Sequence, residues 1–300
     1  MIRFWPDCRD SSTLLDRRHI IRNFDKTASS YHHAAVCQRE IADRLLDRLE
    51  FVKIAPKVIV EVGARTGYIT ENLGRCYPDA QLIATDWSIN SLQKLTANPN
   101  LLRITADPDH IPLASSSADL LIANLVWTWS NNGQDCLREW RRLLKPGGLL
   151  LFTAFGPDTL CELRASFAAV DESAHVHLFL DMHDIGDLVL SAQFSDTVMQ
   201  AERITFNYAR LAGLWHDLRG TGFTNVLTSR RRGLTGKNLW RNMELAYHQW
   251  VSSEGDWPVS VEVVYGVGWA QEPSSKQTND QGEVSIPVSD IKIHGGRYGS

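Results

Sequence analysis

The sequence predicts an α/β protein built on a doubly wound, mostly parallel sheet of seven strands. Five apolar runs of strand length alternate with helical segments in the first half of the chain. Such alternation is typical of parallel sheets, in which a helix forms each crossover. The first run enters a glycine turn, and two further strand-like runs follow in the second half. We expect those two runs to pair as a hairpin, so that an antiparallel strand near the C-terminus closes the sheet.

The expected strands are apolar runs bounded by turn residues. They span residues 57–62, 81–86, 101–107, 119–125, 149–155, 197–206 and 259–269. Helices are expected between them, because apolar residues recur there at helical spacing. These helices span residues 68–76, 88–95, 134–144, 159–170, 185–193, 211–220 and 238–251. Lys145-Pro146-Gly147-Gly148 ends one helix and turns the chain into the fifth strand.

The two ends of the chain differ from this pattern. Residues 1–20 are polar and irregular, which predicts a mobile arm. Between residues 21 and 50, Ile41, Leu45 and Leu49 recur among charged residues, which predicts a helix. Residues 274–283 are polar and are expected to form a loop.

Composition and charge exclude several classes of protein. The 300 residues are 43% hydrophobic and 22% charged, as in ordinary globular proteins, and the net charge of −4 favours neither nucleic acid nor a membrane surface as a partner. The five cysteines contain no C-x-x-C pair, which predicts reduced thiols in the cytoplasm and no metal site. No apolar stretch is long enough to span a bilayer.

The most informative motif is Val58-Ile59-Val60-Glu61-Val62-Gly63-Ala64-Arg65-Thr66-Gly67. A buried strand that runs into a glycine turn and then a helix forms a nucleotide-type pocket in open α/β sheets. A dinucleotide fingerprint needs glycines where Arg65 and Tyr68 stand, so NAD and FAD are disfavoured. An acid two residues before Gly63, with Gly67 four residues after it, is similar to motif I of the class I S-adenosylmethionine (SAM) methyltransferases.

Polar residues also end the next three expected strands. Asp86 ends the second strand, Asp107 the third, and Asn124 with Leu125 the fourth. Acids at such positions can cap turns or helices, but ligands of open sheets also bind at the carboxyl ends of the strands. Together with Glu61 near the end of the first strand, these strand ends at one edge of the sheet predict a binding crevice.

Several segments narrow the resemblance to one family. Residues 152–163, Phe-Thr-Ala-Phe-Gly-Pro-Asp-Thr-Leu-Cys-Glu-Leu, resemble the F-x-T-F-G-x-x-T-L-x-E-L segment of malonyl-acyl carrier protein O-methyltransferases. Further segments resemble that family in the same order along the chain. They are residues 24–31, 119–125, 218–222, 232–237 and 263–266.

The resemblance implies a class I SAM methyltransferase fold in four parts. These are a mobile arm (1–20), a lid helix (21–50), a SAM-binding Rossmann-like core (51–156), and the C-terminal half of the fold with lid and acceptor insertions (157–293). Gly63 and Gly67 would lie along the methionine part of SAM, with Glu61 near its ammonium group. Asp86 would accept the ribose hydroxyls, Asp107 would meet the adenine, and Asn124 and Leu125 would lie beside the sulfonium.

The implied reaction is methyl esterification of the malonyl carboxylate on an acyl carrier protein, an early step of biotin synthesis. No catalytic residue is required, because a carboxyl with a pKa near ~4 is already ionised at neutral pH. Tyr31 could line the acceptor side, or it could simply pack within the lid. Acyl carrier proteins are acidic, so a basic docking face is expected. The candidate cluster is Arg230, Arg231, Arg232, Lys237 and Arg241.

Two alternatives remain open at this point. The chain could be a diverged, non-catalytic relative that has lost SAM binding through Arg65. It could also be a SAM-fold enzyme with another acceptor or chemistry, such as a protein arginine hydroxylase. The sequence leaves the oligomeric state undecided.

Overall fold

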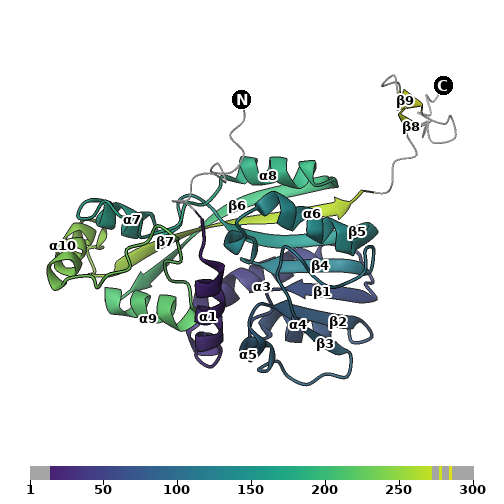
Figure 1. Ribbon diagram of the computed structural model, residues 1–300, viewed down its shortest axis with the longest axis horizontal. Helices are drawn as coiled ribbons and strands as arrows, with labels where there is room; N and C mark the ends of the chain where they lie inside the picture. The colour runs from purple at the N-terminus through teal and green to yellow at the C-terminus, as the bar shows by residue number, and fades with distance from the viewer. Residues whose placement is uncertain (1–13, 272–276, 279–283, 286–300) are drawn as a thin grey trace, which may run out of the picture.

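A computed structural model describes residues 14–271, 277–278 and 284–285. Seven strands form one sheet in the order β3-β2-β1-β4-β5-β7-β6 (Figure 1). The strands are β1 (Val58–Val62), β2 (Gln81–Asp86), β3 (Leu101–Thr105), β4 (Ala118–Asn124), β5 (Leu144–Phe155), β6 (Phe194–Tyr208) and β7 (Trp257–Ala270). β1 to β5 are parallel, and β7 runs antiparallel to both β5 and β6, which confirms the predicted sheet. A separate short pair joins β8 (Gln277–Thr278) to β9 (Val284–Ser285).

The helices follow the predicted order, with shifted ends. They are α1 (Arg17–Thr27), α2 (Tyr31–Ala34), α3 (Val36–Glu50), α4 (Tyr68–Cys76), α5 (Ile89–Leu92), α6 (Gly133–Leu143), α7 (Cys161–Ala168), α8 (Met182–Ser191), α9 (Leu211–Thr221) and α10 (Lys237–Tyr247). Two short 3-10 helices, η1 (Trp127–Trp129) and η2 (His248–Trp250), complete the described elements.

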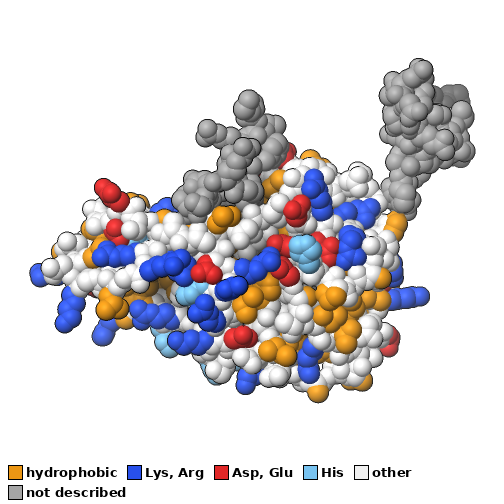
Figure 2. All heavy atoms as spheres, viewed as in Figure 1, with side chains coloured by type: hydrophobic (Ala, Val, Ile, Leu, Met, Phe, Trp, Pro, Cys, Tyr) orange, Lys and Arg blue, Asp and Glu red, His pale blue; other side chains and the backbone are white. Residues whose placement is uncertain are grey.

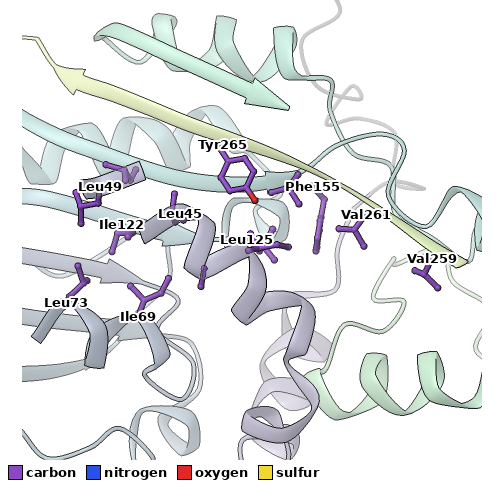
Figure 3. Packing of buried hydrophobic residues seen from close by; sticks show 14 of the residues in the cluster. Leu45, Leu49, Ile69, Leu73, Ile122, Leu125, Phe155, Val259, Val261 and Tyr265 are labelled. Carbon is purple, nitrogen blue, oxygen red and sulfur yellow. The ribbon is translucent and has the colours of Figure 1, made fainter. Parts of the chain in front are cut away.

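The sheet is covered on both faces, and the strand residues alternate between them. On β4, Leu120 and Ile122 pack with α3 and α4, whereas Leu121 and Ala123 pack with α6 and α8. In Figure 3 the side chains from α3, α4 and β4 meet on the first of these faces. Successive side chains of a strand point to opposite faces, so a strand that is buried on both faces requires a continuous apolar run.

β6 and β7 are longer than predicted and extend the sheet toward α7, α9 and α10. They pair continuously from Phe194↔Ala270 to Tyr208↔Trp257, apart from one irregularity. The two strands are not a hairpin, because α9 and α10 lie in the connection between them, alongside the part of the pair that extends beyond the central strands (Figure 1). We call α1, α2 and α9 the lid.

The N-terminal region differs from the expected arm and single helix. Residues 1–13 lie outside the described residues, but Leu15 is buried and forms a bridge with Leu227. Asp16 caps α1 by accepting a hydrogen bond from the His19 backbone, and it pairs with Arg230. Residues 21–50 contain parts of three helices, and the Ser30 hydroxyl donates to the Gly220 carbonyl of α9 where α1 and α2 meet. Tertiary contacts therefore order a segment that the periodicity presents as continuous.

Two further expectations concern the predicted loop near the C-terminus and the absence of a membrane-spanning segment. Most of the predicted loop at 274–283 lies outside the described residues, and residues 277–278 form β8. Among the helices that the structure describes, none is long and apolar enough to cross a membrane.

Candidate cofactor crevice and acceptor cavity

The β1–α4 turn is held in a conformation that glycine permits. Gly63 and Gly67 have φ values of 74° and 91°, in the left-handed region that side chains disfavour. A Cβ atom on Gly63 would lie 2.1 Å from Cγ2 of Val126. The Gly63 and Ala64 amides donate to the carbonyl of Thr85, which ties the turn to β2. The turn thus lies between the ends of β1, β2 and β4, where ligands of open sheets bind.

Arg65 also has a left-handed backbone, with φ of 49°. Its backbone N–H donates to Oδ2 of Asp86 at 2.9 Å. Its side chain is 7% exposed and reaches toward the lid rather than toward solvent. The guanidinium donates to the Thr221 carbonyl at 3.0 Å and lies 3.8 Å from the ring centroid of Phe24. The sequence alone leaves this inward orientation undecided.

The two acids nearest the turn have different environments. Asp86 is buried and accepts backbone N–H bonds from Arg65 and Ser88 at its two oxygens. Burial raises its pKa, although the Arg65 charge and these hydrogen bonds oppose the shift. Glu61 is also buried, and Thr70 donates a hydrogen bond to its Oε2. Burial raises the pKa of Glu61 to about 8, so the protonated form is the main one near neutral pH.

The end of β4 forms the opposite side of the crevice. Asn124 donates to the Gln38 carbonyl of α3 at 3.0 Å and accepts from Thr153 of β5. Leu125 has φ of 60° and donates its N–H to the Thr153 hydroxyl at 2.9 Å. These bonds fix the strand end against both α3 and β5.

The structure brings part of the predicted set together. Gly63, Asp86, Asn124 and Leu125 line one crevice, with Tyr31 from the lid. Asp107 is instead engaged by Arg17 of α1, at 2.5 Å, and Glu61 faces Thr70. Sequence reasoning missed several lining residues, which are mostly aromatic. They are Phe24, Gln38, Trp87 and Phe223.

Only one of those missed residues had a clear signal in the sequence. Trp87 directly follows the Asp86 strand end, so its place in the chain could have identified it. The others come from α1, α3 and the segment just after α9, and only the tertiary fold brings them to the crevice.

A second, apolar cavity of about 250 Å³ adjoins the crevice. Gln38, Trp129 and Phe223 line both spaces, so the two adjoin at these side chains. Phe155, Phe167 and Trp240 contribute to the remaining wall. Such a cavity suits an acyl group better than a charged one.

His177 and Tyr31 are among the titratable side chains that border these spaces. His177 lines the apolar cavity, and burial lowers its pKa to about 4, so it is neutral at neutral pH. Its Nε2 accepts the Val226 N–H at 3.3 Å, which gives it a structural partner. Tyr31 is partly buried, and its ring lies 4.3 Å from the Arg65 guanidinium carbon. Burial raises the Tyr31 pKa, although Arg65 opposes the shift.

The predicted basic cluster divides into buried and exposed members. Arg230 is half-buried and is bound by Asp16 and the Leu227 carbonyl. Arg231, Arg232, Lys237 and Arg241 are exposed, on and before α10. Leu234, in the loop among them, is 96% exposed. In Figure 2, Lys and Arg side chains gather over the part of the molecule that carries α1, α9 and α10 in Figure 1.

A second basic helix is α6, and its cations are engaged. Arg138 pairs with Asp135, Arg142 with Glu139, and Lys145 at the start of β5 with Asp119. Leu137 and Trp140 are buried on the opposite side of α6. This helix is therefore an amphipathic helix of the scaffold.

A glycine turn at the switch point, an acid ending β2 and a lid over the strand ends together define a class I SAM-dependent methyltransferase. A family described as "Methyltransferase domain" matches residues 60–152. The fold resembles that of the Bacillus subtilis YcgJ protein, with a TM-score of 0.55 at 12% identity over 77% of this chain and 99% of that one. It also resembles the protein bound to the Haloferax volcanii Trm112 methyltransferase activator, with a TM-score of 0.54 at 16% identity over 85% and 99%.

Sequence relatives define the family more narrowly. Malonyl-acyl carrier protein O-methyltransferase 1 of Coxiella burnetii is 39% identical over 92% of this chain and 96% of its own length. The corresponding enzyme of Halorhodospira halophila is 38% identical over 93% and 96%. The chain belongs to the malonyl-acyl carrier protein O-methyltransferase family, as its sequence segments predict.

Proposed function

We propose that this chain transfers the methyl group of SAM to the free carboxylate of malonyl-acyl carrier protein. The names of its relatives give the reaction, and the arrangement of the site is consistent with it. The observation that carries the proposal is that the polar crevice and the apolar cavity adjoin, with Gln38, Trp129 and Phe223 lining both. A donor bound in one space would thus face an acyl acceptor bound in the other.

The crevice has the polar groups that SAM requires. Asp86 has two carboxylate oxygens that can accept ribose hydroxyls in addition to their backbone donors. Gly63 would let the backbone approach the methionine part, with Gly67 behind it at the start of α4. Asn124 and Leu125 would border the sulfonium, while Glu61 and Asp107 would act near the ammonium and adenine only after leaving Thr70 and Arg17.

The closed crevice is small for this ligand. Its volume is about 30 Å³, which is room for about two water molecules. Phe24, Tyr31 and Arg65 fill the side toward the lid. Binding would therefore require the lid and the Arg65 side chain to move apart.

The chemistry needs positioning rather than a base. Bound SAM supplies an electrophilic methyl group on a positively charged sulfur. The malonyl carboxylate is ionised at neutral pH, so no side chain has to remove a proton. The apolar cavity would exclude water and strip solvent from the carboxylate, and closure of the lid would hold the reactants in line. His177 is neutral there and adds no competing charge.

The acyl carrier protein would dock on the exposed basic residues near α10. Arg231, Arg232, Lys237 and Arg241 provide positive charge, and the exposed Leu234 provides an apolar contact. An acidic partner would be steered toward this face and then anchored on it. By family resemblance the methyl ester would serve an early step of biotin synthesis, and the expected compartment remains the cytoplasm.

Neither alternative finds support among the relatives. The arginine-hydroxylase alternative is not favoured by any feature of the crevice. The non-catalytic alternative depends on Arg65, whose side chain reaches the lid and is not fixed by a carboxylate.

The test is methylation of purified malonyl-acyl carrier protein with SAM, followed by mass spectrometry of the carrier protein. We expect a gain of one methyl group on malonyl-loaded but not acetyl-loaded carrier protein. The absence of any gain, from a protein shown to bind S-adenosylhomocysteine, would overturn the proposed acceptor.

A further inference from the structure

Arg65 is a buried cation with an incomplete set of partners. Its Nη2 atom donates to the Thr27 hydroxyl and the Thr221 carbonyl, at 3.3 and 3.0 Å. Its Nε and Nη1 atoms are buried and have no hydrogen-bond partner among the described residues. A guanidinium has five N–H groups, so three of them lack an acceptor. Leaving a buried charge so poorly paired is unfavourable, and an anion would relieve it.

The surroundings of Arg65 keep its side chain in the site. Phe24 and Tyr31 lie against the guanidinium, with its carbon 3.8 and 4.3 Å from their ring centroids. The backbone N–H of Arg65 donates to the Asp86 carboxylate, which fixes the backbone from which the side chain extends. An arginine stacked on aromatic rings retains its charge and directs its N–H groups in the plane of the guanidinium.

Arg65 lies where the polar crevice and the apolar cavity meet. Arg65 lines the crevice, while Thr221, whose carbonyl it binds, lines the apolar cavity. A carboxylate that reached the Arg65 guanidinium would find Nε and Nη1 without another acceptor. Carboxylates are the anions that a guanidinium binds most specifically, by paired hydrogen bonds.

We propose that Arg65 is the carboxylate receptor of this site. The proposal rests on the proposed function, in which each reactant carries a carboxylate. One belongs to the amino-acid end of SAM, and the other is the malonyl group. Binding of either would exchange the Thr27 and Thr221 contacts for a charged pair, so Arg65 would also link ligand binding to the position of the lid.

The test compares ligands with and without the carboxylate, by calorimetric titration at equilibrium. The variants are Arg65→Gln and Arg65→Lys. The first ligand pair is S-adenosylhomocysteine and its decarboxylated analogue. The second pair, measured with S-adenosylhomocysteine present, is malonyl-loaded and acetyl-loaded carrier protein. Arg48→Gln is the control, because Arg48 also lies over an aromatic ring, that of Tyr265, but does not line the crevice.

The two carboxylate sources give distinct results. If the donor supplies the carboxylate, Arg65→Gln weakens S-adenosylhomocysteine about tenfold or more and leaves the decarboxylated analogue unchanged. If the acceptor supplies it, the same variant leaves S-adenosylhomocysteine unchanged and weakens malonyl-loaded relative to acetyl-loaded carrier protein. Arg65→Lys should restore part of the affinity in either case, because it retains the charge.

Other results would overturn the proposal. Unchanged affinity of Arg65→Gln for all four ligands would show that the residue binds no carboxylate. An equal loss for ligands with and without the carboxylate would show a structural role only. If the parent protein fails to methylate malonyl-acyl carrier protein, the proposed function fails, while the S-adenosylhomocysteine pair still tests Arg65 independently.

Discussion

Gly63 has no room in the crevice for even one side-chain carbon. Its φ of 74° and the 2.1 Å separation between an added Cβ and Val126 both oppose any side chain. We expect Gly63→Ala to lower the free energy of unfolding by about 3 kcal/mol, from backbone strain and overpacking together. Urea denaturation of the purified variant measures this loss.

A second variant separates the two causes. Val126→Ala removes the Cγ2 atom that the new methyl group would strike. Gly63→Ala should therefore cost less in the Val126→Ala background than in the parent, with the backbone strain and a 3.2 Å approach to the Val126 Cβ remaining. An equal cost in both backgrounds would show that the contact with Val126 contributes nothing.

Glu61 should make stability depend on pH. Its pKa in the folded protein is raised to about 8 from the ordinary value of 4.5 by burial. Between these two values the folded protein keeps a proton that the unfolded chain has released, so stability falls as pH rises through this window. The slope for one proton is about 1.4 kcal/mol per pH unit. Glu61→Gln, which resembles the protonated acid, should flatten the decline in urea denaturation between pH 5 and about 8.

The matched control for Glu61 is Glu50→Gln, at the exposed end of α3. It should follow the pH dependence of the parent protein. If Glu61→Gln also follows the parent, Glu61 is ionised in the folded protein and its burial does not control this dependence.

At the scale of the element, α1 is positioned by its N-terminal cap. Asp16 accepts from the His19 backbone N–H and pairs with Arg230, whose side chain is 17% exposed. The His19 bond in particular lowers the Asp16 pKa, so this support is lost as pH falls through the folded value. Because α1 is part of the lid and carries Phe24 and Thr27, which contact Arg65, loss of the cap should also change the lid side of the crevice.

We expect Asp16→Ala to cost about 1 kcal/mol or somewhat more, with faster amide hydrogen exchange in α1 than in the sheet. Asp16→Asn retains a capping acceptor but loses the ion pair, so it should show a smaller effect. Exchange measured by mass spectrometry resolves the helix from the sheet. Equal exchange in Asp16→Ala and the parent would show that the cap does not hold α1.

At the scale of the whole molecule, surface charge should control the encounter with the carrier protein. The net charge is −4, yet Arg231 and Arg232 lie in an exposed basic segment. Arg231→Glu with Arg232→Glu should raise the KM for malonyl-acyl carrier protein about tenfold at low salt, with kcat little changed. The difference should shrink as salt is added, because exposed charges are screened.

The control for this prediction is a charge reversal of equal size elsewhere. Arg75 and Arg138 are 74% and 59% exposed at their side chains, on α4 and α6. Arg75→Glu with Arg138→Glu should leave the KM close to that of the parent. Equal increases in both double variants would indicate a general charge effect rather than docking.

The local sequence pattern predicted the helices and strands better than it predicted which distant residues they contact. The alternating strands and helices, the glycine turn and the acids at strand ends were readable because each depends on nearby residues. Residues 21–50 were predicted as one helix, but the helical structure breaks at 28–30 and at Ala35, and at the first break Ser30 contacts α9, which is distant in sequence. The extra length of β6 and β7 likewise depends on their mutual pairing.

The same distinction holds within the site. Gly63, Asp86, Asn124 and Leu125 were predicted to share an edge, and all four line the crevice. Their role in binding SAM, like that of Glu61, Gly67 and Asp107, remains a prediction. Arg230 was grouped with the docking residues by its position in the chain, but Asp16, 214 residues away, engages it.

The sequence by itself determined the sheet, the turn at its switch point and the family, because these follow from periodicity, glycine placement and contiguous motifs. The tertiary structure decided where the charged side chains go. Arg65 could have faced solvent, and it is buried because Phe24, Tyr31 and Thr221 meet above the turn. Packing of the lid on the sheet brings these residues, which are distant in sequence, into contact with Arg65. No local sequence pattern specifies that packing.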